Sequence, residues 1–194
     1  MLLATGLTTY EGKKWQKHRK IINPAFHFEK LKVLSPTILQ CCDEMVGKWD
    51  GMLSYDGKCE IDVWPFFQNL TSDIISKTAF GSSYEDGKRI FDLLKEQGGL
   101  IMKLHYAFIP GSWLLPTATN KRMREISKDI EASIKVIINE REKAMKAGEV
   151  MNRDLLGILL ESNHREIQEH GNNEVVGMTI QEVIEECKLF YLAG

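Results

Sequence analysis

The sequence lacks the features that mark secreted, zinc-binding or membrane-spanning chains. Its four cysteines show no C-x-x-C spacing, which argues against a zinc site or a disulfide framework. The start, MLLATGLTTYEG, has no basic stretch and too short an apolar run for a signal peptide. No run reaches the roughly 20 apolar residues needed to cross a bilayer. We therefore expect reduced cysteines, a cytosol-facing protein and no membrane anchor within these residues.

A large excess of charge of one sign is missing as well. The 25 Lys and Arg residues nearly balance 27 Asp and Glu, for a formal net charge of -2. The chain as a whole is therefore not a polyanion binder, and any basic function must be local. With 194 residues and 43% hydrophobic content, it has enough apolar material for one core and is not expected to be disordered.

Strand-like alternation of polar and apolar residues is nearly absent, except in CEIDVW at residues 59–64. Elsewhere apolar residues recur at helical spacing, which predicts a mainly α fold with at most a short strand near 59–64. The expected helices cover residues 9–23, 36 to about 53, 65–80, 86–108, 120–147, 153–162 and 179–194.

Local signals set several of these boundaries. Ser35 suits an N-cap, with Pro36 in the first helical position. Thr179 and Glu182 have the spacing of a capping box at the start of the last helix. The polar stretch 163–177 is expected to be a surface loop. An apolar stripe predicted to be core consists of Ile38, Cys41, Cys42, Met45, Trp49 and Leu53.

The end of the last expected helix, KLFYLAG, is apolar on several faces. A helix that is apolar all round belongs inside a larger protein. We therefore expect 1–194 to be a single incomplete domain from the middle of a longer chain, although Gly194 could instead be an ordinary helix stop. Such a piece should expose apolar surface and self-associate.

The basic run YEGKKWQKHRK contains Trp15 and Arg19, four residues apart and hence on one helix face. An indole N–H beside a guanidinium forms a fork of donors suited to a carboxylate. The alternative is a cation–π or packing pair on a surface helix. Nucleic-acid binding is not favoured, because no recognisable nucleic-acid module surrounds the run.

Metal and hydrolase signatures do not emerge from the remaining residues. His164 and His170 lie among glutamates, but their spacing does not place both rings on one helix face, so we expect a solvated polar segment. No phosphate-cradling glycine loop, H-E-x-x-H motif or Ser-His-Asp arrangement is present.

Five segments follow one another in the order GKKWQKHRKIINPAF, FGSSYEDGKRIF, IPGSWLLPTATNKRM, LLGILLESN and EECKLFYLAG. Together they resemble a plant cytochrome P-450, of the clade that contains secologanin synthase and related terpenoid oxidases. The resemblance covers essentially the whole chain and implies part of the cytochrome P-450 fold, from about the C helix to the start of the I helix. In that family a W-x3-R pair on the C helix binds a haem propionate, and Trp15 and Arg19 match it.

Other parts of the family pattern are missing. Ala193 and Gly194 match the first two letters of the A-G-x-x-T motif on the I helix, but its threonine would come later. The E-x-x-R pair, the membrane anchor and the loop with the axial cysteine are absent, and Cys187 lies on a different element. The resemblance therefore implies no catalytic residue and no metal ligand within these residues, and the segment alone should form no haem–thiolate centre.

For a full-length relative, the resemblance implies insertion of one oxygen atom from O2 into a lipophilic, terpenoid-like molecule. Haem would be the cofactor, and NADPH would supply electrons through a reductase at the cytosolic face of the endoplasmic reticulum. Lys13, Lys17 and Lys20 would face that reductase. Segments near 100–108 and 113–115 would roof the substrate pocket. The positions that would line it are Leu189, Leu192, Ala193 and Gly194.

A different class of function also fits these residues. A non-catalytic helical interaction module, or a truncated remnant without haem chemistry, would use the basic helix or an apolar groove to bind a partner. Continuation past Gly194 into the rest of the family pattern would indicate the enzyme, whereas a stop codon there would favour the module.

Overall fold

The computed structural model describes residues 4–81, 84–103, 114–148, 154–170 and 176–193. These residues form helices joined by short connections, and no strand occurs among them. The α-helices are α1 (Gly12–Ile22), α2 (Phe28–Asp50), α3 (Val63–Phe80), α4 (Tyr84–Lys103), α5 (Ala118–Lys146), α6 (Leu155–Glu169) and α7 (Ile180–Ala193), and a 3-10 turn, η1 (Asn23–Phe26), follows α1. The mainly α prediction is confirmed.

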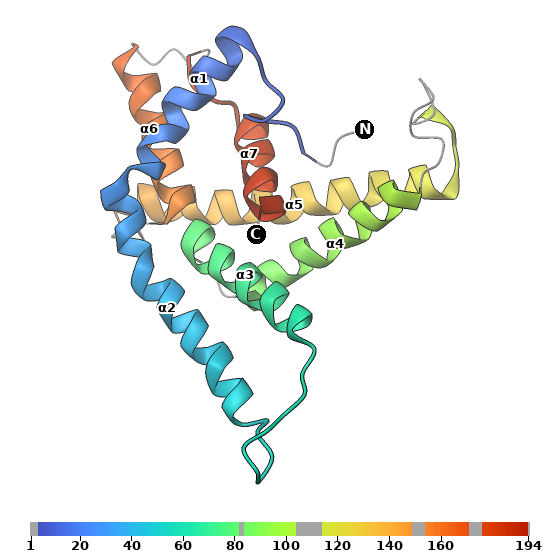
Figure 1. Ribbon diagram of the computed structural model, residues 1–194. Coiled ribbons are helices and arrows are strands. Elements are labelled where there is room, and N and C mark those ends of the chain that lie inside the picture. The colour runs from blue at the N-terminus through green and yellow to red at the C-terminus, as the bar shows by residue number, and fades with distance from the viewer. Residues whose placement is uncertain (1–3, 82–83, 104–113, 149–153, 171–175, 194) are drawn as a thin grey trace.

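Helix α5, 29 residues long, is the axis around which the other helices are arranged (Figure 1). Helix α7 crosses the middle of α5, α4 runs along one half of it, and α6 packs near its other end. Helices α2 and α3 pack on each other and extend away from this axis, whereas α1 lies beside α6. The first and last described helices are thereby brought to the same side of α5.

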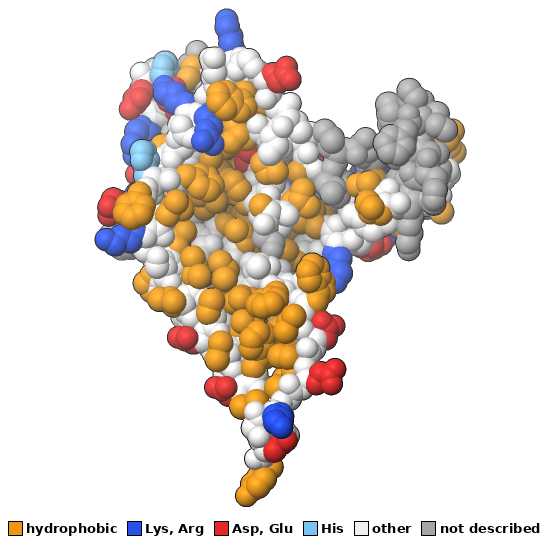
Figure 2. All heavy atoms as spheres, viewed as in Figure 1, with side chains coloured by type: hydrophobic (Ala, Val, Ile, Leu, Met, Phe, Trp, Pro, Cys, Tyr) orange, Lys and Arg blue, Asp and Glu red, His pale blue; other side chains and the backbone are white. Residues whose placement is uncertain are grey.

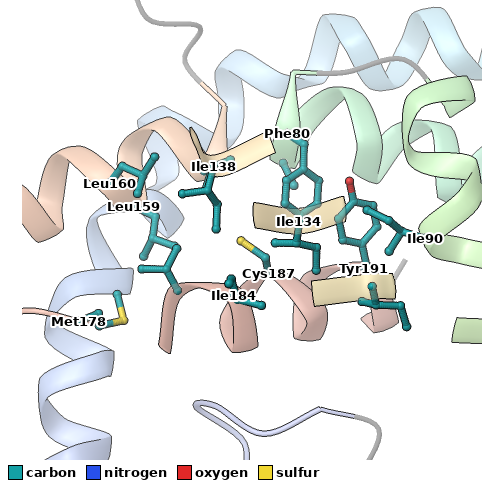
Figure 3. Close-up of a cluster of buried hydrophobic side chains, with 14 of the residues drawn as sticks. Phe80, Ile90, Ile134, Ile138, Leu159, Leu160, Met178, Ile184, Cys187 and Tyr191 are labelled. Atoms are coloured by element: carbon teal, nitrogen blue, oxygen red, sulfur yellow. The ribbon is translucent and has the colours of Figure 1, made fainter. Parts of the chain in front are cut away.

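The core lies where α3, α5, α6 and α7 meet (Figure 3). Ile126, Ile130, Ile134 and Ile138 recur every four residues along α5 and are no more than 1% exposed, because this spacing keeps them on one face. Each buried isoleucine contributes about 1.5–3 kcal/mol relative to an exposed one. The helix predicted over 120–147 is confirmed as α5, and Ile138 is the last of its fully buried isoleucines.

Aromatic stacking joins the end of α3 to α7 inside this core. The rings of Phe80 and Tyr191 lie 4.1 Å apart and nearly parallel, and Phe91 from α4 meets Tyr191 edge-on at 5.1 Å. Offset stacked and edge-to-face pairs are favourable arrangements of aromatic rings. The contact fixes the last turns of α7 against two other helices.

Buried polar contacts fix the start of α6. Asp154 is 3% exposed, and its side chain accepts a hydrogen bond from Gly157 N at 2.8 Å. The Arg141 guanidinium lies 2.7 Å from the second carboxylate oxygen of Asp154 and donates to Phe80 O at 2.9 Å. Burial raises the pKa of Asp154, with the Gly157 hydrogen bond and Arg141 acting in the opposite direction. One arginine thereby ties together α3, α5 and α6.

Several helix ends follow the local signals in the sequence. Thr179 and Glu182 form the predicted capping box, with hydrogen bonds of 3.0 Å from Thr179 N to Glu182 and 3.2 Å from Glu182 N to Thr179 Oγ1. Gly81 ends α3 with a φ of 60°, and Gly148 follows α5 with a φ of 74°. Both adopt the left-handed conformation that glycine tolerates best.

The strand near 59–64 is not formed. Residues 59–62 have no regular structure, and α3 already begins at Val63. The Asp62 side chain accepts a hydrogen bond from Trp64 N at 3.1 Å, so this segment serves as a helix cap. The described residues contain no neighbouring strand that could pair with it.

Helix α2 differs from the prediction at its start and in its burial. It begins at Phe28, with Pro36 inside the helix rather than at its first position, although an interior proline removes a hydrogen bond. Cys41 is the one fully buried member of the predicted core stripe, and Leu53 is 47% exposed. The stripe was predicted from periodicity, but α2 packs on little except α3 and η1.

Helix α6 continues to Glu169, so the loop prediction for 163–177 is wrong over its first residues. Asn163 explains the difference, because its side chain donates to Met178 O at 3.0 Å and accepts from Met178 N at 2.7 Å. A buried amide satisfied by another segment is compatible with a helix interior. Residues 104–108 and 194, at the ends of two other predicted helices, lie outside the described residues.

Candidate functional site

Most of the basic residues on α1 are paired with acids of α6 and α7. Lys14 and Lys17 each place their ammonium nitrogen 3.2 Å from a Glu182 carboxylate oxygen, and Lys17 also donates to Gly177 O at 2.9 Å. Lys20 lies 2.6 Å from Glu166. These contacts attach α1 to the two C-terminal helices.

Trp15 and Arg19 are exposed, and they differ from the paired lysines of α1 in their lack of contacts with these acids. Trp15 is 42% exposed. Neither side chain forms a hydrogen bond or ion pair with any residue in the described ranges. Indole and guanidinium groups can only donate. We call Trp15 and Arg19 the donor pair; both side chains are open to solvent and could donate to an acceptor that binds against this face.

Glu182 is the electrostatic centre of the α1–α7 contact. Burial alone would raise its pKa, but the Thr179 backbone hydrogen bond and the ammonium groups of Lys17 and Lys14 outweigh burial and lower the pKa to about 2. The carboxylate is therefore ionised at neutral pH and attracts the cations of α1.

A buried pair lies beneath this surface contact. His18 and Glu186 are both 0% exposed, and Nδ1 of His18 lies 2.7 Å from Oε1 of Glu186. Leu7 N donates to the other carboxylate oxygen at 3.2 Å, and Gly6, with a φ of 107°, lies so close that an added Cβ would approach Glu186 within 3.0 Å. The N-terminal turn, α1 and α7 thus meet at one carboxylate.

His18 and Glu186 belong to none of the candidate sites that the sequence patterns indicate. The available signal was the acidic pair Glu185 and Glu186 within a helix whose other faces are largely apolar. Glu185 accepts a hydrogen bond from Thr5 Oγ1 at 2.7 Å, across the chain, and lies 2.7 Å from Lys188 of its own helix. Buried carboxylates persist only where donors compensate their lost hydration.

The predicted pocket residues gather at the C-terminal end of α7. Leu189 is half-buried, whereas Leu192 and Ala193 are exposed; Gly194 lies outside the described residues. Leu192 borders a cavity of about 340 Å³ between α3, α4 and α7. The predicted roof falls partly on residues 104–113, which are not described. Leu114 and Leu115 are exposed and precede the first turn of α5. This end of α5 is away from its crossing with α7 (Figure 1).

Apolar side chains spread over one face of the molecule, across its middle and down over α2 and α3 (Figure 2). Phe28 is 74% exposed, Trp64 67% and Leu39 62%. Monomeric soluble domains rarely expose so much contiguous apolar surface. The predicted exposure of apolar surface is confirmed, whereas self-association stays a prediction.

Cys187, His164 and His170 form no reactive or metal-binding site with the described residues. Cys187 is fully buried, and burial, reinforced by the nearby charge of Glu186, raises the pKa of its thiol. It is therefore a neutral core residue. His164 and His170 are exposed on α6 and its cap, and no cluster of three potential metal ligands occurs among the described residues. Nor does that part of the chain hold a helix long and apolar enough to cross a bilayer.

Comparison with known proteins accounts for this arrangement of helices. The family model of cytochrome P450 matches residues 2–194. Cytochrome P450 716A67 of Medicago truncatula is 60% identical over 193 residues, covering 99% of this chain and 37% of its own length. The 11-oxo-beta-amyrin 30-oxidase of Glycyrrhiza uralensis is 59% identical over 192 residues, with the same coverage of 99% and 37%.

A solved structure shares the fold. Retinoic acid bound cyanobacterial CYP120A1 aligns with a TM-score of 0.68 and 21% sequence identity, over 97% of this chain and 38% of that one. The chain thus spans little more than a third of the proteins it matches, in sequence and in structure. The family model matches residues 2–194, and the sequence identity to the relatives extends over nearly the whole chain. The chain therefore belongs to the cytochrome P450 family.

Proposed function

We propose that this chain is part of a haem-dependent monooxygenase that oxidises a lipophilic, terpenoid-like molecule with O2 and reductase-supplied electrons. The single observation that supports the site is the donor pair. It is exposed and unpartnered on a helix whose other cations, apart from Lys13, are mostly held by α6 and α7. We further propose that residues 1–194 are one portion of a larger domain.

The donor pair fits one edge of haem. A propionate is a carboxylate, and Trp15 and Arg19 supply donors only, so each can bind its oxygens without competing for a proton. The exposure of both side chains leaves room for such a ligand. A hydrogen bond to a charged group is worth about 1.5–3 kcal/mol. Bound haem would supply the oxygen-activating chemistry.

The residues of this chain would hold and shield the reactants. Arg19 would neutralise a propionate charge, and Trp15 would donate its indole hydrogen to the same group. Leu189, Leu192 and Ala193 would offer an apolar wall at the end of α7, continued by Gly194, and exclude water from the substrate side. The small side chain of Ala193 would leave space for the substrate.

The substrate class rests on the relatives and on the apolar character of the chain. Two relatives are named 11-oxo-beta-amyrin 30-oxidase, one of them from Medicago truncatula at 57% identity. A terpenoid skeleton is largely hydrocarbon and would be recognised by apolar side chains with a few polar groups. We therefore propose oxidation of a terpenoid-like molecule.

An NADPH-dependent reductase at the cytosolic face of the endoplasmic reticulum would deliver the electrons. Among the three lysines predicted to face it, Lys13 is exposed and lacks an ion-pair partner in the described ranges. Lys17 and Lys20 are already held by Glu182 and Glu166. We propose Lys13 as the first residue to test for this contact.

Haem retention tests the site directly. In the intact haem-loaded protein, Arg19→Ala and Trp15→Phe should speed transfer of haem to excess apomyoglobin by roughly ten- to a hundredfold, the equivalent of one charge-assisted hydrogen bond. Lys20→Ala is the matched control, because it removes an exposed cation from the same helix. Equal transfer rates for Arg19→Ala and the control would refute the assignment.

The isolated chain provides a second test. Without a cysteine that could serve as the axial ligand, residues 1–194 should show no thiolate-type Soret band in a reduced carbon monoxide difference spectrum. Sequencing the transcript past Gly194 would separate the enzyme from the interaction module. A stop codon directly after Gly194 would contradict the proposed monooxygenase.

A further inference from the structure

His18 lies between the lysines that pair α1 with α7 and the lysine that pairs it with α6. It is the most buried polar residue of that helix. Its side chain is 0% exposed, whereas Lys14 and Lys20 are 48% and 61% exposed. Nδ1 of His18 and Oε1 of Glu186 are 2.7 Å apart, within hydrogen-bond distance. This contact is fully buried, whereas the ion pairs around it lie at the surface.

The surroundings of the imidazole leave it little freedom. Nε2 lies 3.4 Å from a Glu182 carboxylate oxygen, without the alignment of a hydrogen bond. The ring of Tyr10 meets the imidazole edge-on, with centroids 4.7 Å apart. Glu186 is held in turn by Leu7 N at 3.2 Å. The N-terminal turn, α1 and α7 therefore fix the ring from three sides.

The same residue adjoins the donor pair in sequence. His18 precedes Arg19 and follows Trp15 by three positions, so the three residues lie within little more than one turn of α1. A helical turn is stiff, because its backbone hydrogen bonds fix the relative directions of its side chains. The rotation of α1 about its axis decides where the donor pair points, and the buried contact of His18 with Glu186 is one of the contacts that hold this rotation.

We propose that His18, bound to Glu186, is a positioning residue that orients Trp15 and Arg19 toward their carboxylate ligand. The inference rests on the proposed function, in which that ligand is a haem propionate. His18 itself does not touch the ligand, since its side chain is wholly buried against α7. It acts by fixing α1, as outer-shell partners do for metal ligands.

Haem transfer from the intact haem-loaded protein to apomyoglobin is the test, followed in the Soret region. His18→Ala should raise the transfer rate about tenfold, the lower range for losing an outer-shell partner. His18→Asn keeps a donor near the position of Nδ1, so its haem transfer rate should stay close to that of the wild type. Glu186→Gln keeps the shape of the side chain that contacts His18 but removes its charge. Its haem transfer rate should lie between those of His18→Asn and His18→Ala.

A merely structural role predicts a different pattern in a double-mutant cycle. If His18 acts through the donor pair, His18→Ala adds little to the transfer rate once Trp15→Phe and Arg19→Ala are both present. If His18 only stabilises the fold, its roughly tenfold effect persists in that background and overturns the inference. Should His18→Ala fail to fold, the same cycle is run with Glu186→Gln.

The test also separates this inference from the proposed function. If Arg19→Ala alone leaves haem transfer unchanged, the donor pair does not bind haem and both proposals fail. If Arg19→Ala speeds transfer but His18→Ala and Glu186→Gln do not, only the positioning role is overturned. Lys20→Ala serves again as the control, because it cuts a 2.6 Å pair between α1 and α6 and should leave transfer unchanged.

Discussion

Replacing Glu182 by glutamine removes one charge from the contact between α1 and α7 while keeping its capping function. Glutamine can also complete a capping box, so the backbone donor of Thr179 stays satisfied. The change therefore isolates the attraction between the carboxylate and the ammonium groups of Lys14 and Lys17, which lie 3.2 Å away. It should loosen α1 and leave the rest of the fold intact.

The magnitude follows from the pKa of Glu182, which falls from its ordinary value of 4.5 to about 2. At about 1.4 kcal/mol per pH unit, this difference corresponds to about 3 kcal/mol of stabilisation at neutral pH. Because the folded-state pKa is the lower one, the stabilisation is complete above pH 4.5 and is lost as the pH falls toward 2. By pH 3 less than half of it should remain.

Hydrogen exchange of α1 amides in the intact protein measures this local stability, with wild type and Glu182→Gln compared at each pH. The two should differ most at pH 7 and approach each other toward pH 3. Glu161→Gln is the control, because Glu161 and Arg165 form a mostly exposed pair worth at most about 1 kcal/mol. A difference between wild type and Glu182→Gln that is the same at pH 7 and pH 3 would refute the reasoning.

Three further predictions concern the interior. Arg141→Met should lower the free energy of unfolding by about 3–5 kcal/mol in denaturant titrations, since it leaves the buried Asp154 carboxylate without its cation; recovery should follow if Asp154→Asn is added. Ile134→Ala, at a fully buried position, should cost about 2–5 kcal/mol in the same titrations, whereas Val136→Ala, 55% exposed on the same helix, should change stability by less than about 0.5 kcal/mol. Cys187 should stay unmodified by iodoacetamide at pH 8 in mass spectra of the native protein, because its buried thiol does not ionise; alkylation before unfolding would contradict this.

Sequence reasoning worked where the information is local. The isoleucines of α5 repeat within a single helix, and the Thr179–Glu182 capping box spans four residues, so neither depends on distant segments. Gly81 similarly marks the end of α3 by its own conformational freedom. Such features are readable because the residues that decide them are adjacent in the chain.

Prediction failed where distant segments decide the outcome. Pro36 lies inside α2, and only Cys41 of the stripe that follows it is fully buried, because burial depends on which helices pack there. Asn163 stays within α6 because Met178 satisfies its amide. Periodicity reports a helix face, but it does not reveal what that face contacts.

The candidate site shows the same division. The pattern of Trp15 and Arg19 is local, and a resemblance between segments was enough to assign it a role, which remains a proposal. The pairing of His18 with Glu186 joins residues 168 positions apart, and nothing within either helix identifies the other as its partner. Only the folded arrangement brings them together.

The long separation between His18 and Glu186 has a consequence for the order of folding. Contacts between residues far apart in the chain require closing a large loop, and they form late. Helix α1 is synthesised well before α7, so its contacts with Glu182 and Glu186 can form only after the last described helix has been made. We therefore expect the α1–α7 contact to be among the last to form, because the entropy of the intervening chain opposes its closure.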